Sequence, residues 1–589
     1  MSDYSILSTS GINQMINSFK SVQQQRQVYP LQNRINTYSN LSSTWSSLST
    51  SLTSLQTAAN TLKYTGTSSI FNSSSATLSD DSFFSVTASS NATPASYAIR
   101  VNQLAKSDLV VSDTMDSDTE VTTMAGTHKI KIQSGDYVSH VSLDLTASET
   151  NSSVMSSIAD AINNDYAVVE SDAKTATDTF TGSGTFKINI DGTETSIDYD
   201  YSTGYTYDDV VADLVSKINS NVDGVTAEKV TDGSNVNLKI TVDDKSQYIT
   251  MANADDTGTL LDSSNLNIDV TKEKSASNLA SSSVFTPNTG NSKLSITAKN
   301  TGYDNRLIMS DESGSALDFV GLTSTILSNH TVTTDDTSAG FMYDATSSTS
   351  NELNSILEFN GISIQRSSNT ITDLVSNLTF TLKAKMETTD TTVTATVGTD
   401  VNEIKSKVND FISKFNDSYL YIKNRYYSGD SGRGIFAGDS TAYALMKKLQ
   451  DTVMGKVSGI TDGNYSYLSE VGITFDPGTG LSLSDSSKFE SALQNHLSQV
   501  EDLFNSTNGV ATTIYDALDS YVGADGSIAN VINSLDNNVN YLNDRVDSIQ
   551  SSIDKRAENL RKQYENLQQQ LAQLLMGQQM YSQIGGGFF

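Results

Sequence analysis

The end of the chain carries a narrow apolar stripe that a single helix cannot bury by itself. Within INSLDNNVNYLNDRVDSIQSSI, from Ile532 to Ile553, apolar residues recur at alternating intervals of four and three. This spacing is the heptad pattern of a coiled-coil helix, which needs a second helix to cover its seam. The predicted seam residues are Leu535, Val539, Leu542, Val546, Ile549 and Ile553, and the register continues through Leu560, Leu567 and Leu574.

A second stripe with the same spacing lies near the start of the chain, in residues 38–62. Its predicted seam residues are Leu41, Trp45, Leu48, Leu52, Leu55 and Leu62. Neither stripe can be buried alone, because helical stability in proteins comes mainly from packing of an apolar face. We therefore predict that residues 38–62 pack antiparallel against part of residues 528–574. Both chain ends would then form one helical coiled-coil stalk.

The segments at the extreme ends have too little apolar content to order by themselves. Ile12 and Ile16 have helical spacing, but they lie in a polar, Gln-rich stretch that is followed by Pro30. We expect residues 1–37 to be a flexible segment that orders only against another surface. We expect residues 560–589 to form a terminal helix that ends in a flexible tail from about residue 575.

The middle of the chain has the two-residue alternation and the turn signals of β-strands. Turns of the type used by hairpins occur at Asp191-Gly192 and at Asn360-Gly361, each between alternating apolar residues. Two stretches, near residues 127–163 and 185–219, each read as a hairpin followed by a short helix ending in Ile-Asn. The middle therefore appears as β-rich head domains that contain a small α+β repeat.

These signals predict an α+β multidomain fold in which a stalk from both termini carries β-rich head domains. After the head, helical spacing returns, and one hairpin is expected at Asp476-Pro477-Gly478. The predicted segments are a flexible amino-terminal segment (1–37), the first part of the stalk (38–74), the head domains (75–398), the second part of the stalk (399–559) and the terminal helix with its tail (560–589).

The charge of the chain disfavours several classes of partner. It has 68 acidic and 37 basic residues and a formal net charge of −31, which repels nucleic acid and anionic lipid. It contains no cysteine, so disulfides and thiolate chemistry are excluded. The first residues lack the pattern of a cleaved secretory signal, and the chain has no apolar run of membrane-spanning length. We therefore expect neither nucleic-acid binding nor membrane insertion.

The sequence contains no convincing catalytic or metal-binding pattern. GDSG at residues 429–432 resembles the loop around a serine nucleophile, but Ser431 has no histidine base in a comparable context. The four histidines have no metal-ligand spacing, and we interpret them as ordinary surface residues. They are His128, His140, His330 and His496. We expect no enzyme activity, no metal and no cofactor.

Four passages stand out by their order and spacing along the chain. They are SFFSVTASSNATPASYAIRVNQLAKSD, SILEFNGISIQRSSNTITDLVSNLTFTLKA, IFAGDSTAYALMKKLQ and YLSEVGITFDPGTGLSLSDSSKFESAL. As a collinear set they resemble the flagellar filament capping protein family, also called hook-associated protein 2. The two Ile-Asn units are similar to a small repeat found in several flagellar axial proteins.

The resemblance implies a structural cap at the distal end of the bacterial flagellar filament. It implies a ring-like homo-oligomer whose plate is made by the β domains and whose legs are made by the paired terminal helices. Flagellin would be the partner whose folding and insertion the cap promotes, and a flagellar export chaperone would bind the chain before secretion. The location implied is extracellular, at the flagellum tip, after export without a cleaved signal peptide.

Two other functions stay open at this point. The Ser/Thr/Asp-rich middle would suit a flagellar-tip adhesin, and another axial protein, such as a hook-filament junction protein or flagellin, would share the helical ends. The opening of the chain does not resemble that of flagellin, and the passage NGISIQRSSNTITDLVSNLTFTL is typical of the cap family. The cap is therefore the preferred hypothesis.

Overall fold

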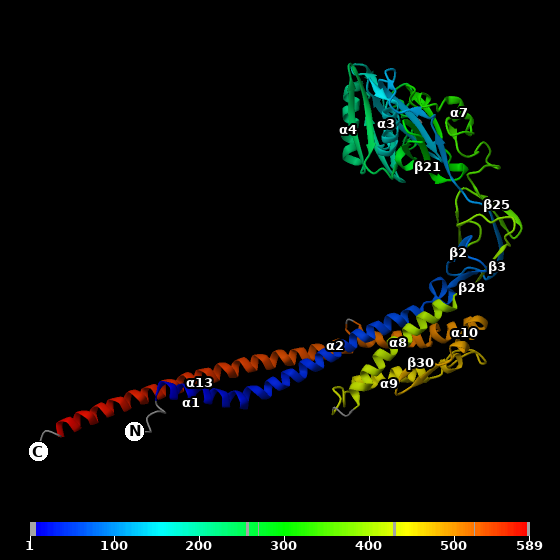
Figure 1. The fold of residues 1–589 in the computed structure, drawn as a ribbon. Coiled ribbons are helices and arrows are strands. Elements are labelled where there is room, and N and C mark those ends of the chain that lie inside the picture. Colours follow the sequence, from blue (N-terminus) through cyan, green and yellow to red (C-terminus); the bar gives the residue numbers. More distant parts are fainter. Residues whose placement is uncertain (1–7, 255–257, 269, 428–431, 524, 586–589) are drawn as a thin grey trace. The chain divides into compact units, whose positions relative to one another are not determined.

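The computed structural model of the chain divides into two compact units (Figure 1). Unit 1 comprises Met1–Ser75, Ser89–Asn91 and Gly398–Phe589, and unit 2 comprises Ala76–Ala88 and Ala92–Val397. Unit 1 is mainly helical and contains both chain ends, whereas unit 2 is rich in strands. The predicted α+β multidomain fold is confirmed. The structure describes residues 8–254, 258–268, 270–427, 432–523 and 525–585.

Unit 1 is built from long helices around one hairpin. The helices are α1 (Thr9–Gln23), the π-helical turn η2 (Gln24–Val28), α2 (Tyr29–Lys63), α8 (Val401–Tyr426), α9 (Ser440–Met454), α10 (Ser486–Asn495), α11 (Leu497–Asn505), α12 (Val510–Val522) and α13 (Ser527–Gly585). Short 3-10 turns are η3 (Gly66–Ser68), η4 (Ile70–Asn72) and η6 (Leu468–Val471). The hairpin is β29 (Ile473–Asp476) with β30 (Gly480–Leu483), at the turn predicted from the sequence.

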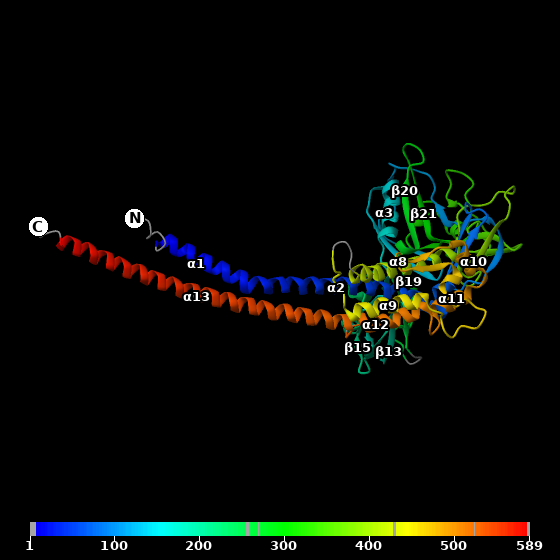
Figure 2. The same cartoon turned by 90° about the horizontal axis from the view of Figure 1, so that it is seen from below.

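Helix α13 lies antiparallel to α2 and then to α1 and η2, as Figures 1 and 2 show. Four polar contacts fix the register, because the residue number falls in one helix as it rises in the other. The pairs are Ser42–Asp536 at 2.8 Å, Gln24–Gln550 at 3.2 Å, Lys20–Asp554 at 2.9 Å and Asn13–Arg561 at 2.8 Å.

The described part of the amino-terminal segment is helical from Thr9 onward, and its flexibility stays a prediction. Ile12 and Ile16 are buried in one cluster with Ala557 of α13, so the same chain supplies the surface against which they order. At the other end, α13 continues through residue 560 to Gly585 without a break. Residues 1–7 and 586–589, also covered by the prediction of flexible ends, lie outside the described residues.

Pro30 does not separate the first segment from the stalk. A π-helical turn over Gln24–Val28 precedes it, in which the Tyr29 N–H donates to the Gln24 carbonyl. Pro30 then lies in the first turn of α2. Proline is tolerated in a first turn because those N–H groups need no intrahelical partner, and a π-type turn absorbs a local irregularity within a longer helix.

The later part of the α2 stripe packs against α8 and α12 instead of α13. Helix α13 begins only at Ser527 and already lies opposite Ser42 nine residues later, so it cannot reach the end of α2. There, Lys63 forms a 2.8 Å ion pair with Asp516 of α12. The predicted antiparallel pairing of the two heptad segments is therefore right for the beginning of the stripe and wrong for the rest.

Unit 2 contains three separate cores. One lies between a five-stranded sheet of order β1-β28-β3-β24-β25 and a three-stranded sheet of order β2-β27-β26. The strands are β1 (Ser74–Leu78), β28 (Val393–Thr399), β3 (Ala95–Gln103), β24 (Ser355–Phe359), β25 (Ile362–Arg366), β2 (Phe84–Ala88), β27 (Leu378–Leu382) and β26 (Thr370–Ile371). Its largest buried side chains are Phe84 and Phe380.

The first repeat packs hairpin β7 (Gly126–Ser134) and β8 (Tyr137–Leu145) with α3 (Asn151–Asn164) in the second core. The same core is also lined by a sheet of order β20-β21-β4-β23, in which β5 pairs with β21. These elements are β20 (Ala280–Phe285), β21 (Asn291–Thr301), β4 (Ser107–Val111), β23 (Gly340–Phe341) and β5 (Met115–Asp116). Short elements are β6 (Glu120–Val121), β9 (Glu149–Thr150), α5 (Ala276–Leu279), η5 (Tyr303–Asn305), α6 (Ala316–Phe319) and α7 (Ser324–Asn329).

The second repeat packs hairpin β13 (Ser183–Ile190) and β14 (Thr193–Asp200) with α4 (Tyr207–Asn221) in the third core. A further sheet covers α4, with β10 (Val168–Glu170), β17 (Asn235–Val242), β11 (Lys174–Thr175) and β16 (Val225–Asp232). Strands β12 (Thr179–Phe180) and β15 (Tyr205–Thr206) pair beside it. One seven-stranded sheet, β14-β13-β18-β19-β8-β7-β22, includes both repeat hairpins and adds β18 (Tyr248–Asn253), β19 (Val270–Lys274) and β22 (Ile308–Ser313).

The Asn of each Ile-Asn pair has the same structural role in the two repeats. The Asn163 side chain donates to the Ser282 carbonyl at 2.7 Å and accepts from the Ser282 N–H at 3.0 Å. The Asn219 side chain does the same with Ala227, at 2.9 and 2.8 Å. The preceding Ile162 and Ile218 are fully buried. Each amide therefore ties the end of its helix to the backbone of a later strand.

We predict that Leu52→Ala lowers the free energy of unfolding of unit 1 by about 2–5 kcal/mol, the usual cost of truncating a buried leucine. Leu52 is fully buried, whereas Leu574 on α13 is 71 % exposed, so Leu574→Ala is the matched control. The single tryptophan, Trp45, lies in the same core and provides the fluorescence signal for a urea titration. Equal midpoints for the two variants would contradict the assignment of the core.

We also predict that Asn219→Ala speeds amide exchange of Ala227 about five-fold, because removing a pair of hydrogen bonds costs about 1 kcal/mol. Asn221→Ala is the control, since the Asn221 side chain bonds only within its own helix, to the Lys217 carbonyl. Hydrogen exchange read by mass spectrometry compares the variants. Unchanged exchange in Asn219→Ala would show that the amide bridge does not hold the repeat together.

Candidate functional site

The twelve predicted seam residues are placed on α2 and α13, and eight of them are buried. On α2, Leu41 is half-buried, while the others are fully buried: Trp45, Leu48, Leu52, Leu55 and Leu62. On α13, the buried residues are Leu535, Leu542 and Ile553, and the half-buried residues are Val539, Val546 and Ile549. The α13 seam is thus less completely covered than the α2 seam.

The α2 residues share one core with α8, α9 and α12. The Trp45 ring lies 4.6 Å from that of Phe436, and its indole N–H is buried without a hydrogen-bond partner. Aromatic residues of α8, among them Phe411 and Phe415, are fully buried in the same cluster. Of the predicted α13 residues, Leu535 belongs to this core. The structure therefore brings the α2 seam together with several helices and not with one partner helix.

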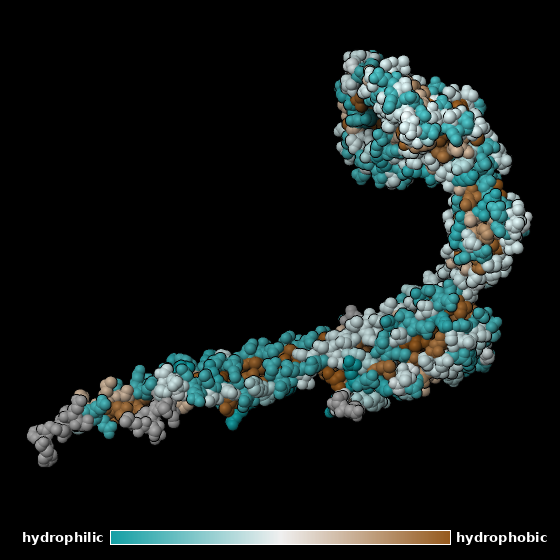
Figure 3. Space-filling view, in the orientation of Figure 1, coloured by the Kyte–Doolittle hydropathy of each residue, from teal (hydrophilic) through white to brown (hydrophobic). Residues whose placement is uncertain are grey.

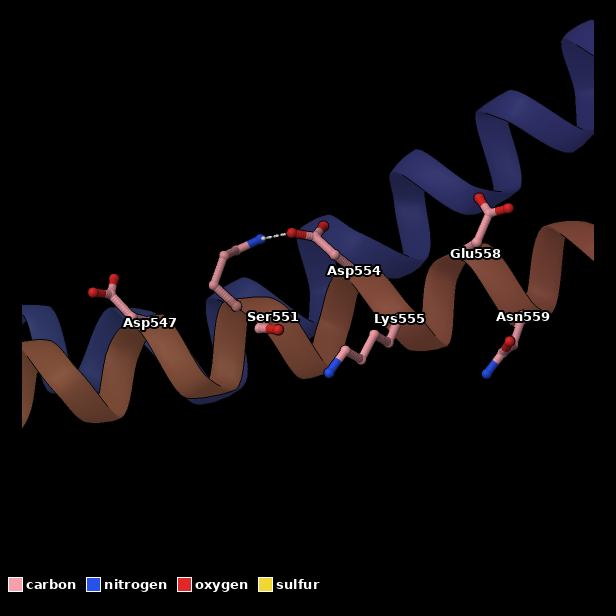
Figure 4. Close-up of a pocket in the computed structure, with 7 residues that line it drawn as sticks. Asp547, Ser551, Asp554, Lys555, Glu558 and Asn559 are labelled. Carbon is pink, nitrogen blue, oxygen red and sulfur yellow. Dashed lines mark hydrogen bonds between the residues drawn. The ribbon is translucent and has the colours of Figure 1, made fainter.

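Along α13 the partner changes from α2, which it contacts at Asp536, to η2 at Gln550 and α1 at Asp554. Polar pairs line this part of the contact, and the Lys20 ammonium lowers the pKa of the Asp554 carboxyl. Figure 4 shows the polar side of α13 here, where Asp547, Lys555 and Asn559 extend away from the helix. This part of the stalk is therefore a narrow apolar contact between two helices with charged flanks.

Sequence reasoning missed the partners that cover the α2 stripe. Helix α12 buries Val510, Ile514 and Leu518, whose spacing of four residues was visible in VATTIYDALDSYV. The apolar face of α8 was recognised, but nothing in its spacing said which helix it would cover. A helical stripe predicts that a partner exists, and it does not identify that partner.

The last described turns of α13 expose apolar side chains that no described residue covers. Leu567, Leu571, Leu574 and Tyr581, here called the terminal stripe, continue the heptad spacing. Leu574 and Tyr581 are 71 % and 82 % exposed, and Leu571 is half-buried. Brown and tan atoms in this part of α13 are visible in Figure 3. Contiguous exposed apolar surface on a soluble protein marks an interaction site. The terminal stripe is therefore the candidate assembly surface.

The charge distribution supports the same conclusion. Although the chain carries a net charge of −31, its sequence has no charged side chain after Glu565. A partner of this segment meets no side-chain charge to desolvate and no like-charge repulsion. The terminal stripe can therefore bind another uncharged apolar helix face, which the rest of the acidic surface could not do as easily.

No catalytic or metal site emerges from the described part of the chain. Within residues 8–585, apart from the undescribed gaps, no group of three or more His, Asp or Glu side chains is arranged to hold a metal ion. Ser431 lies outside the described residues. Two histidines differ from the prediction of surface positions, since His128 and His330 are buried. They bond to the Met124 carbonyl and to Asp108, both at 2.9 Å, which explains why burial is tolerated.

Helices long and apolar enough to span a bilayer are absent from the described residues.

Comparison with known proteins connects both ends of the chain to one family. The family model described as flagellar hook-associated protein 2 N-terminus matches residues 8–108, and the one described as its C-terminus matches residues 353–575. Curated relatives named flagellar hook-associated protein 2 include one from Escherichia coli O157:H7, 28% identical over 266 residues, which covers 42% of this chain and 52% of the relative. Another, from Salmonella typhimurium, is 29% identical over 206 residues, which cover 32% of this chain and 42% of the relative.

The chain thus spans about half of the length of these curated relatives. A solved structure described as the flagellar cap protein FliD D1-D2-D3 domains from Escherichia coli is 20% identical and covers 84% of this chain and 99% of its own, with a TM-score of 0.45. The two family models together match more than half of the 589 residues, at the chain ends that form the paired helices. The chain therefore belongs to the flagellar hook-associated protein 2 family.

Proposed function

We propose that this protein is a structural cap at the distal end of the bacterial flagellar filament. In this proposal, several copies form a plate with legs, and flagellin that has been exported folds and inserts beneath it. The observation that carries the proposal is that both family models match the chain ends, which pair as antiparallel helices in unit 1. The partners are other copies of the chain, flagellin and, before secretion, a flagellar export chaperone.

The helices of unit 1 are suited to serve as the legs. Their seam is held by buried apolar residues along α2, while α13 ends in the uncovered terminal stripe. Such a leg is stiff where it is paired and apolar where it must contact another subunit. A helix face of this kind binds partner helices through anchors spaced three and four residues apart.

The cap would act by shape rather than by chemical work. Flagellin has its own apolar surface to bury, so its folding supplies the favourable free energy once a sheltered space holds it at the filament end. The plate blocks escape of the subunit, and the legs rest on the growing end and yield as each subunit is added. The protein would accordingly be extracellular and located at the flagellum tip.

We predict that a chain truncated before Ser527 fails to restore filaments in cells that lack their own copy. The truncation removes α13, with which α1, η2 and the first part of α2 pair, so the legs cannot form. Filament length by electron microscopy and flagellin in the medium are the measurements, with the full chain as control. Full-length filaments from the truncated chain would show that the helical legs are dispensable.

We predict that Leu567→Glu combined with Leu574→Glu also abolishes filament growth but leaves thermal unfolding unchanged. The substitutions place charge in the terminal stripe, which is exposed in the single chain and would be buried on assembly. The control, Gln569→Glu with Gln573→Glu, adds the same charge outside the stripe, because at about 100° per residue Gln569 lies across the helix from Leu567 and Gln573 lies about 100° from Leu574. Equal filament lengths for the two double variants would contradict the assignment of the stripe.

A further inference from the structure

The two repeats of unit 2 share one sheet, and a short strand makes the connection between them. Strand β19 pairs antiparallel with β18 beside the second repeat and parallel with β8 of the first repeat. In the parallel pairing, Glu273 is in register with Val138. Its carboxylate is nearly buried, with 4 % of the side chain exposed. A buried carboxylate at a short strand contact makes this connection sensitive to charge.

His140 of β8 lies between two carboxylates from different strands. Its Nδ1 is 2.8 Å from an oxygen of Glu273 on β19, and its Nε2 is 3.4 Å from an oxygen of Glu312 on β22. The His140 backbone N–H also donates to Glu273, at 2.9 Å. A neutral imidazole has one N–H, so only the imidazolium can offer a proton to both carboxylates.

A third carboxylate bonds to the backbone just after β19. Asp165, which follows α3 of the first repeat, accepts hydrogen bonds of 2.7 Å from the Ser139 hydroxyl of β8 and from the Ala276 N–H after β19. Asp165, Glu273 and Glu312 line the same cavity as His140, with a volume of about 460 Å³. The other charged groups on this cavity are Lys129, Glu170 and Lys239, and Lys131 also acts on His140.

We propose that His140, Glu273, Glu312 and Asp165 form a proton-dependent latch, which holds the two repeats together at mildly acidic pH and loosens as the pH rises. When His140 loses its proton, the ring can no longer bridge β8, β19 and β22. The carboxylates of Asp165, Glu273 and Glu312 then face one cavity together with the Glu170–Lys129 pair, and their mutual repulsion is opposed mainly by lysines that have other partners. Lys129 pairs with Glu170 at 2.9 Å, and Lys239 pairs with Glu228 at 3.0 Å.

The protonation equilibria of His140, Glu273 and Asp165 act in the same direction. The hydrogen bond to Glu273 raises the pKa of His140, and burial raises the pKa of Glu273. Burial also raises the pKa of Asp165 to about 6. A group whose pKa is higher in the folded state stabilises that state below its unfolded pKa and loses the contribution as pH rises through the folded pKa. The latch therefore weakens between about pH 4 and the raised pKa of His140.

Surface carboxylates of unit 2 titrate in a separate range. Hydrogen bonds from Ser338 and Thr337 lower the pKa of Asp335 to about 2, and Ser202 lowers that of Asp200. Such groups add stability as pH rises toward about 4 and change little above it. A loss of rigidity above that pH therefore reports on the latch and not on these surface groups.

The test measures the distance between the repeats in the full chain by double electron–electron resonance. The chain has no native cysteine, so Ser156→Cys on α3 and Ser216→Cys on α4 place one spin label on each repeat. We expect the distance distribution to widen about two-fold from about pH 5.5 to about pH 8.5, the range in which histidine loses its charge. Equal widths at the two pH values would overturn the proposal.

His140→Gln, which keeps a hydrogen-bond donor and cannot be protonated, is expected to give the wide distribution at both pH values. His496→Gln is the matched control, because His496 is exposed in unit 1, and it should retain the pH response. Should His140→Gln not fold, Glu312→Gln tests the latch from its more exposed side and should reduce the response by about half. Persistence of the full response in the folded latch variant would overturn the role of His140.

Discussion

The covering of one apolar stripe by helices from distant parts of the chain is the constraint on which unit 1 depends. Helix α2 buries residues between Ile35 and Leu62, and those from Trp45 onward lie in one core with helices from later parts of the chain. The chain therefore has to return to α2 after all of unit 2 has been built, first with α8, then with α12 and finally with α13. The order of helices in the sequence is a consequence of this requirement.

Local patterns were sufficient to predict the elements but not their partners. The hairpin turns at Asn360-Gly361 and Asp191-Gly192, and the helix that ends at each Ile-Asn pair, follow from turn chemistry and periodicity. By contrast, Leu52 and Leu55 of α2 were predicted to pack against α13. Heptad spacing describes only one helix face and does not identify the helix that covers it. The partners depend on where α13 begins, which is a tertiary fact. Burial of His330 was likewise invisible, since its partner Asp108 is 222 residues away.

The distribution of charge along α13 separates two kinds of contact. Up to Arg561 the helix meets α1 and η2 through one ion pair and two side-chain hydrogen bonds beside a narrow apolar seam, and these contacts fix one register. After Glu565 the sequence carries no charge, so nothing of this kind can select a register there. An intramolecular contact that forms once can use specific polar pairs. A surface that binds and releases its partner repeatedly is better built from apolar residues alone. Buried ion pairs cost free energy to desolvate when the surfaces meet, and more to separate.

The topology also determines how the stalk can form. Ser42 and Asp536 are 494 residues apart, and closing a flexible loop of that size costs about 5 kcal/mol in chain entropy. In unit 2 the Ser79 N–H donates to the Thr394 carbonyl at 3.0 Å, so the chain enters and leaves unit 2 at neighbouring positions. Folding of unit 2 therefore shortens the loop and lowers its closure cost by about 1 kcal/mol, because that cost grows only with the logarithm of loop length. In unit 1, the Asp400 N–H donates to the Ser73 carbonyl at 2.8 Å in the same way. This bond joins the residue before α8 to the segment that follows α2, so the chain leaves and re-enters unit 1 at neighbouring points.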